Sequence, residues 1–148
     1  SASGVSLPAT TETELIAGSA RGKIRTIGFD IQTGATTQNA RNEQIRVYID
    51  GALKFNLSCD FIDLFNGQLL IRKAVAGAVG TMYYADVINS LAGLTVVRTA
   101  SDSVNKCDRI GGFINIPFEF TTSFSLRVYN GTSDAHTAYA SLGYGVYV

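Results

Sequence analysis

The feature that most constrains this chain is a two-residue alternation of apolar and polar side chains between Gly112 and Val148. Its apolar positions fall into three runs: Ile114, Ile116, Phe118 and Phe120; Thr122, Phe124, Leu126 and Val128; Leu142, Tyr144, Val146 and Val148. Because successive residues of a strand point to opposite faces of a sheet, each apolar run must be buried on one face. We therefore predict three consecutive strands that form a meander and close the core of a β-sandwich.

The same period appears earlier in the chain, between Lys23 and Thr33. Ile27, Phe29 and Ile31 fall on one side of this segment. Ile24 is out of phase with them, which predicts a β-bulge near the start of the strand.

The strongest local signal lies between Gln44 and Leu57. Two alternating runs flank the dipeptide Asp50-Gly51, namely Ile45, Val47 and Ile49 before it and Leu53, Phe55 and Leu57 after it. Asp-Gly is favoured in type I′ turns, which require a positive φ at both central residues. The segment is therefore predicted to be a β-hairpin.

The remaining segments give weaker signals. The first 13 residues are predicted to be an arm or a first edge strand, with a frayed terminus as the alternative, and residues 14–148 form one domain. Residues 13–18 and 91–99 each predict a short strand, and residues 60–67 predict a single helical turn capped by Asp60. Residues 69–89 mix helical and alternating spacing, and two strands joined by a glycine turn are favoured. About eight strands in a chain of this length indicate a single jelly-roll, or Greek-key, β-sandwich.

Composition excludes several classes of function. Charged residues make up 16% of the 148 residues, and twelve basic and twelve acidic side chains balance. A soluble monomer has about 25% charged residues, so the low charge and zero net charge favour a subunit that associates with neighbours. No basic cluster points to nucleic acid. No apolar run is long enough to span a membrane, and no secretion signal opens the chain.

The chemistry-bearing residues form no recognisable constellation. His136 lies in a polar segment and is expected to be a solvated loop residue rather than a catalytic one. Cys59 and Cys107 are expected to be buried free thiols rather than a disulfide, and Asp102 and Asp108 to be solvated rather than to bind calcium. The carboxylates show no matched catalytic pair; they are Asp30, Asp50, Asp60, Asp63, Asp86 and Glu119. We predict no catalytic, cofactor-binding or metal-binding residue, no cofactor and no enzymatic activity.

Four segments together resemble a known family. They are RGKIRTIGFDIQ, QIRVYIDGALKFNLSCDFIDLFNG, GGFINIPFEFTTSFSLRVYNG and YASLGYGVYV. In order, they resemble segments of the jelly-roll family typified by difructose-anhydride glycoside hydrolases, with residues 63–67 similar to its DFF-G element and Pro117-Phe118 similar to a later strand. That family has two jelly rolls and forms trimers, an arrangement similar to double-jelly-roll viral capsid proteins. This chain has room for one roll, so the resemblance implies the architecture and trimeric assembly rather than the activity.

These observations leave three hypotheses. The first is a structural virion protein, from a bacteriophage, that decorates a capsid or forms a head fibre and binds copies of itself and other virion proteins. It would be made in the host cytoplasm and would contact neither nucleic acid nor membrane. The alternative is a carbohydrate-binding module or receptor-binding tip that contacts host-surface glycans, which seven tyrosines permit and the lack of tryptophan disfavours. A small glycoside hydrolase is supported by the resemblance alone.

Overall fold

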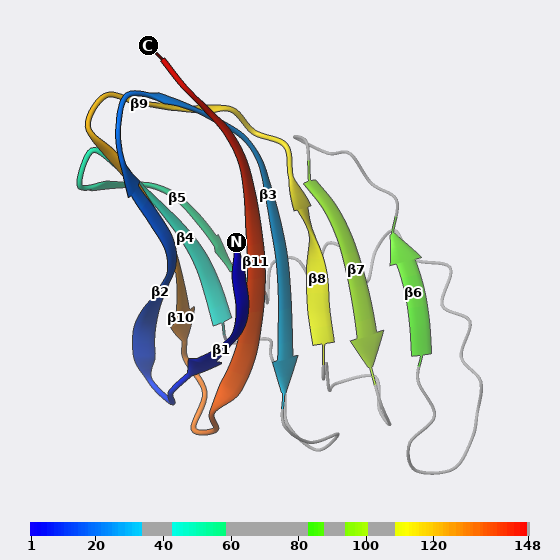
Figure 1. Ribbon diagram of the computed structural model, residues 1–148. Helices are drawn as coiled ribbons and strands as arrows, with labels where there is room; N and C mark the ends of the chain where they lie inside the picture. Colours follow the sequence, from blue (N-terminus) through cyan, green and yellow to red (C-terminus); the bar gives the residue numbers. More distant parts are fainter. Residues whose placement is uncertain (34–42, 59–82, 88–93, 101–108, 148) are drawn as a thin grey trace.

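The protein is all-β in the part of the chain that a computed structural model describes, residues 1–33, 43–58, 83–87, 94–100 and 109–147. Those residues contain eleven strands and no helix. All pairings between the strands are antiparallel, and they form two sheets that pack as a β-sandwich (Figure 1). The predicted fold class is confirmed at this level.

The larger sheet has the strand order β1-β11-β3-β8-β7-β6, with β9 also paired to β3. Its strands are β1 (Ala2–Leu7), β3 (Gly22–Thr33), β6 (Tyr83–Val87), β7 (Leu94–Ala100), β8 (Arg109–Ile114), β9 (Phe118–Phe120) and β11 (His136–Val146). The smaller sheet has the order β2-β10-β4-β5. Its strands are β2 (Thr11–Ser19), β4 (Glu43–Ile49), β5 (Ala52–Ser58) and β10 (Ser123–Asn130).

The core lies between the two sheets, and the apolar phases of β3, β4 and β10 fill much of it. β3 contributes Ile24, Ile27, Phe29 and Ile31, β4 contributes Ile45, Val47 and Ile49, and β10 contributes Phe124, Leu126 and Val128. All of these side chains are at most 5% exposed. Burial of such aliphatic and aromatic side chains is the main favourable term in folding, about 1.5–3 kcal/mol for each.

Two local predictions are confirmed. The pairing of β11 with β3 shifts register between Gly143 opposite Thr26 and Tyr144 opposite Ile24, so Arg25 is the extra residue of a bulge. This bulge returns Ile24 to the core side. In the hairpin of β4 and β5, Asp50 has φ 51° and Gly51 has φ 81°, the left-handed pair that a type I′ turn needs.

The predicted C-terminal meander is wrong. The stretch forms four strands, and each pairs with strands elsewhere: β8 and β9 with β3, β10 with β2 and β4, and β11 with β1 and β3. Alternation reports which face of a strand is buried and carries no information about its hydrogen-bonded neighbour.

Three residues expected in the core are about half exposed. Leu53 is 47% exposed because the register shifts between Val47 opposite Phe55 and Tyr48 opposite Leu53, which turns Leu53 to the outer face. Tyr144 and Val146 are 51% and 52% exposed near the end of β11. The Tyr144 ring still contacts Phe124, with centroids 5.1 Å apart, so its phase is as predicted but its burial is incomplete.

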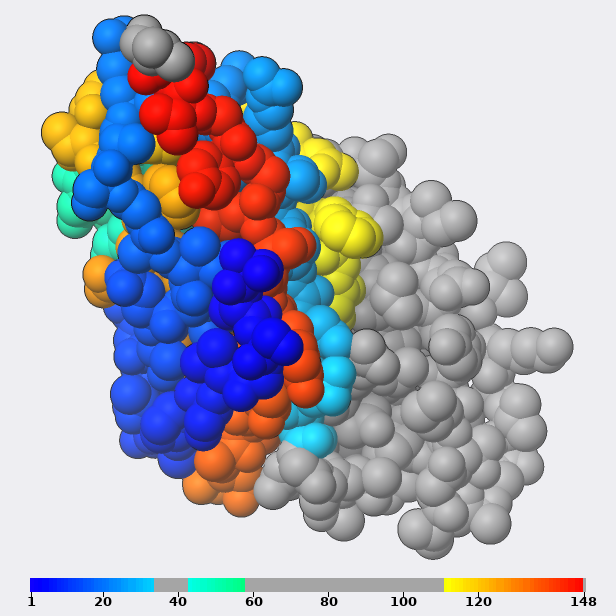
Figure 2. Space-filling view, in the orientation of Figure 1, coloured from blue at the N-terminus to red at the C-terminus, as the bar shows by residue number. Residues whose placement is uncertain are grey.

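The N-terminal residues form regular structure. Residues 2–7 are β1, the edge strand of the larger sheet beside β11, and residues 11–19 are β2, an edge strand of the smaller sheet. Leu7 is fully buried, so part of the predicted arm belongs to the core. Figure 2 shows this N-terminal segment, in dark blue, packed against the orange C-terminal strand.

Several predictions fall on residues outside the described ranges. These are the helical turn at 60–67, most of segment 69–89, the loop at 101–108, both cysteines, and Asp102 and Asp108. The described part of 69–89 is strand β6, and the strand predicted at 91–99 corresponds to β7.

Candidate functional site

The most extensive polar arrangement covers the outer face of the smaller sheet, and we call it the outer polar face. It consists of Glu12 and Glu14 from β2, Ser125, Arg127 and Tyr129 from β10, Gln44, Arg46 and Tyr48 from β4, and Asn56 from β5. These residues alternate with the core residues of the same strands. Strand register places Arg127 between Glu14 and Arg46, and Tyr129 between Glu12 and Gln44.

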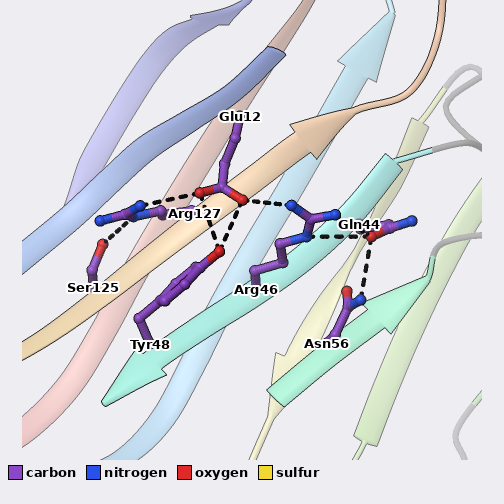
Figure 3. A network of polar contacts seen from close by, with 7 residues as sticks. All are labelled: Glu12, Gln44, Arg46, Tyr48, Asn56, Ser125 and Arg127. Carbon is purple, nitrogen blue, oxygen red and sulfur yellow. Dashed lines mark hydrogen bonds and ion pairs between the residues drawn. The ribbon is translucent and has the colours of Figure 1, made fainter. Parts of the chain in front are cut away.

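Glu12 is the centre of this face (Figure 3). Its carboxylate accepts hydrogen bonds from Arg46 Nη1 at 2.6 Å, from Arg127 Nη1 at 3.1 Å and from the Tyr48 hydroxyl at 3.1 Å. Two arginines directly opposite each other on neighbouring strands would repel. Glu12 bridges them and removes that cost.

Outer contacts extend the network to both sides of Glu12. Arg46 Nη2 donates to Gln44 Oε1 at 2.7 Å, and Arg127 Nε donates to Ser125 Oγ at 2.9 Å. The Ser125 hydroxyl in turn donates to Glu14 at 2.6 Å. The donors and acceptors on this face therefore bind one another.

The guanidinium groups also cover the tyrosine rings. Arg46 lies 4.8 Å from the Tyr129 centroid, and Arg127 lies 4.5 Å from the Tyr48 centroid. Such cation–π contacts contribute about 0.5–1 kcal/mol at exposed sites. They also occupy ring faces on which a sugar would stack, so this face is a poor platform for glycans.

The network holds its members in their charged forms. Burial alone would raise the pKa of Glu12, but hydrogen bonds from Arg46, Arg127 and Tyr48 outweigh burial and hold that pKa below its usual value. The hydrogen bond to Glu12 raises the pKa of Arg127. Two carboxylates and two guanidinium groups give the face no net charge, and the geometry indicates a structural role for it.

A second polar cluster joins the β4–β5 turn to the corner before β10. The Asp50 carboxylate accepts hydrogen bonds from the backbone amides of Thr121, Thr122 and Ser123 at 2.7–3.1 Å and from two threonine hydroxyls. The amides of Thr122 and Ser123 and the Thr121 hydroxyl lower the pKa of Asp50 well below its usual value. We call this cluster the Asp50 clasp. Both oxygens of the carboxylate accept hydrogen bonds from this corner.

A third cluster is buried between the sheets. Glu43 begins β4 and His136 begins β11, and their side chains are both 0% exposed. His136 Nδ1 lies 2.6 Å from Glu43 Oε1. Desolvation raises the pKa of Glu43, and its contact with His136 opposes that rise. The prediction that His136 is a solvated loop residue is therefore wrong.

The structure does not bring the candidate carboxylates together as an acid–base pair within the described residues. Asp50 is engaged in its clasp, and Asp30 accepts a hydrogen bond from Gln32 Nε2 at 2.8 Å. Glu119 is exposed on β9. Asp60 and Asp63 lie outside the described ranges, as does the side chain of Asp86.

The sequence pattern does contain a signal for the buried pair, Glu43 and His136, which was not predicted. Glu43 is in phase with Ile45 and Val47, and His136 is in phase with Ala138, so the two-residue period places both inside the sandwich. Arg46 and Tyr48 occupy the opposite phase of β4. Their pairing with Glu12 depends on long-range register and could not be read from spacing.

Comparisons with known proteins do not assign the chain to a family: no protein-family model matches it, and no curated protein matches it either. Within the described ranges, no group of three or more His, Cys, Asp or Glu residues is placed to hold a metal ion. The described residues include no helix of the length and hydrophobicity needed to cross a membrane.

Proposed function

We propose that the chain is a structural virion protein, a subunit that works by associating with copies of itself, as a trimer, and with other virion proteins. The observation that carries the proposal is an apolar end on β11. Tyr144 and Val146 of β11, and Tyr147 directly after the strand, are each about half exposed, at 51%, 52% and 48%. Large apolar side chains exposed together are typical of surfaces that bind protein.

The charge distribution supports a second copy as the partner. The chain has no net charge, so two copies do not repel each other at long range. The charged groups of the outer polar face pair with one another. The carboxylates of Asp50 and Glu43 also bind groups of the same chain. These contacts favour a structural role over catalysis.

The order of the strands supports the jelly-roll part of the proposal. The first four strands alternate between the sheets, with β1 and β3 in the larger sheet and β2 and β4 in the smaller. The last three alternate again, from β9 in the larger sheet to β10 in the smaller and β11 in the larger. Jelly rolls have this interleaved path, and viral capsid proteins use them widely. We infer a jelly roll with β6 and β7 added at one edge.

Sedimentation velocity on the full chain tests the proposal. We expect the wild type to sediment as an oligomer and the double variant Tyr144→Ser/Val146→Ser to sediment as a smaller species, because two apolar contacts are lost. Leu53→Ser is the matched control, since Leu53 is similarly exposed, at 47%, on the outer face of the smaller sheet. It should leave the oligomer intact.

A circular dichroism melt checks that the double variant is folded, because Tyr144 also contacts Phe124. If that variant unfolds, Val146→Ser alone replaces it. A wild type that remains monomeric at high concentration contradicts the proposal, as does an oligomer that is indifferent to these substitutions.

One observation favours the glycan-binding alternative. Phe113 and Tyr139 are 53% and 37% exposed on the outer face of the larger sheet, and Gly28 lies between Phe113 and Ser141. Exposed aromatic rings can stack on sugars. Binding on a glycan array that is lost in Tyr139→Ala would support this function, and an array without binding would reject it.

A further inference from the structure

The Glu43–His136 pair joins the two sheets inside the core. Glu43 belongs to the smaller sheet and His136 to the larger, and both side chains are fully buried. Asn130 lies opposite Glu43 on β10 and donates to the carbonyl of Leu7 on β1, at 2.9 Å. Polar contacts therefore tie the sheets together at this end of the sandwich.

The pair is incompletely satisfied. Glu43 Oε2 and His136 Nε2 are buried and have no hydrogen-bond partner. A buried polar atom without a partner destabilises the folded state, and more so when its group is charged. Burial at this site therefore strongly favours the form of the pair that carries no net charge.

The surroundings bring no second charge to the pair within the described part of the chain. His136 lies opposite Leu7 on β1 and Thr33 on β3, and Glu43 lies opposite Asn130 on β10. Asp134 is exposed, and its carbonyl accepts from Asn130. Among the described residues, the net charge at this site therefore depends on how many protons Glu43 and His136 hold.

We propose that Glu43 and His136 form a proton-controlled latch between the sheets, strongest when the pair holds one proton and is neutral. With no proton the pair is a buried anion, and with two it is a buried cation. Either charge lacks a counter-ion among the described neighbours, so the latch weakens on both sides. The proposal does not depend on the proposed assembly function.

The sign of the pH dependence follows from proton counts. In an unfolded chain Glu titrates near about 4.3 and His near about 6.5, so between these values the unfolded pair also holds one proton. Above about 6.5 the unfolded pair loses its proton and the folded pair keeps it, so stability falls as pH rises. The raised pKa of Glu43 acts in the same direction. Its contribution to the free energy of unfolding is complete below the pKa of the unfolded chain and is lost as pH rises through the pKa of the folded chain.

Denaturant unfolding of the wild type and of Glu43→Gln at a series of pH values tests the latch. The wild-type unfolding constant should grow by up to about tenfold for each pH unit above about 6.5. In Glu43→Gln the buried imidazole has no carboxylate, so the constant should instead shrink by up to about tenfold per unit as pH rises to about 6.5. Glu119→Gln makes the same change at an exposed site and should follow the wild type.

Parallel profiles for the wild type and Glu43→Gln would overturn the proposal. If Glu43→Gln does not fold, His136→Gln serves in its place, and its loss of stability should begin near about pH 4.3 instead of about 6.5. Loss that begins at the same pH as in the wild type would again overturn it. His136 is the only histidine, so its ring NMR signals report on the pair directly.

Discussion

At Gly18 the backbone of β2 lies against the ring of Phe124, which is 3% exposed in the core. A Cβ atom at Gly18 would lie 2.7 Å from two carbons of that ring. We predict that Gly18→Ala lowers the free energy of unfolding by about 1–3 kcal/mol, because the ring cannot move without disturbing its neighbours.

Urea unfolding measures this effect, and Gly145→Ala is the control. A Cβ atom at Gly145 meets nothing within 4 Å, so this variant should retain wild-type stability. Equal effects of the two substitutions would contradict the packing described at Phe124.

Asp50 acts at the same scale, through a single carboxylate. Asp50→Asn should lower the melting temperature at neutral pH, because an amide cannot accept all the hydrogen bonds that the carboxylate accepts from Thr121, Thr122 and Ser123. The pKa of Asp50 is lowered in the folded chain. Its contribution to stability is therefore present above about pH 3.9 and is lost as pH falls towards the pKa of the folded chain. The difference in melting temperature should therefore shrink in strong acid, and a constant difference would count against the clasp.

At the scale of elements, Glu12 connects the edge strand β2 to both β10 and β4. Glu12→Gln should lower the free energy of unfolding by about 1 kcal/mol at neutral pH, since it leaves Arg46 and Arg127 to repel each other. The lowered pKa of Glu12 means that this contribution disappears as pH falls below about 4.3 through the folded value.

Chemical denaturation at neutral and acidic pH measures this difference. High salt should reduce it, because the network is partly open to solvent. A Glu12→Gln variant as stable as the wild type at low ionic strength would show that the outer polar face does not hold β2 in place.

The sequence predicted which segments form strands better than it predicted how those strands pair. Period-two alternation correctly identified the buried faces of β3, β4 and β10, and Asp50-Gly51 correctly predicted the hairpin. Leu53 was misplaced because a register shift after the turn reverses its phase, and nothing in the local pattern marks that shift. His136 was misplaced because its polar neighbours outweighed its phase with Ala138 and Ala140.

At the scale of the whole molecule, strand order was beyond the reach of the pattern. β10 pairs with β2, more than a hundred residues earlier in the chain. Any two strands pair through the same backbone N–H and C=O groups, so the local sequence does not identify the partner. The outer polar face depends on this order, since Glu12 and Arg127 meet only when β2 lies beside β10. The fold class could therefore be predicted from the sequence, whereas the polar clusters required the structure.

The central proposal is that the chain works by associating with itself. Removing residues 1–13 would not test it cleanly, because Leu7 belongs to the core. The most direct measurement is the molar mass of the intact chain by light scattering after size exclusion, over a range of concentrations. We predict a mass of three times the 15.8 kDa of one chain. A mass of one chain at every concentration would contradict it.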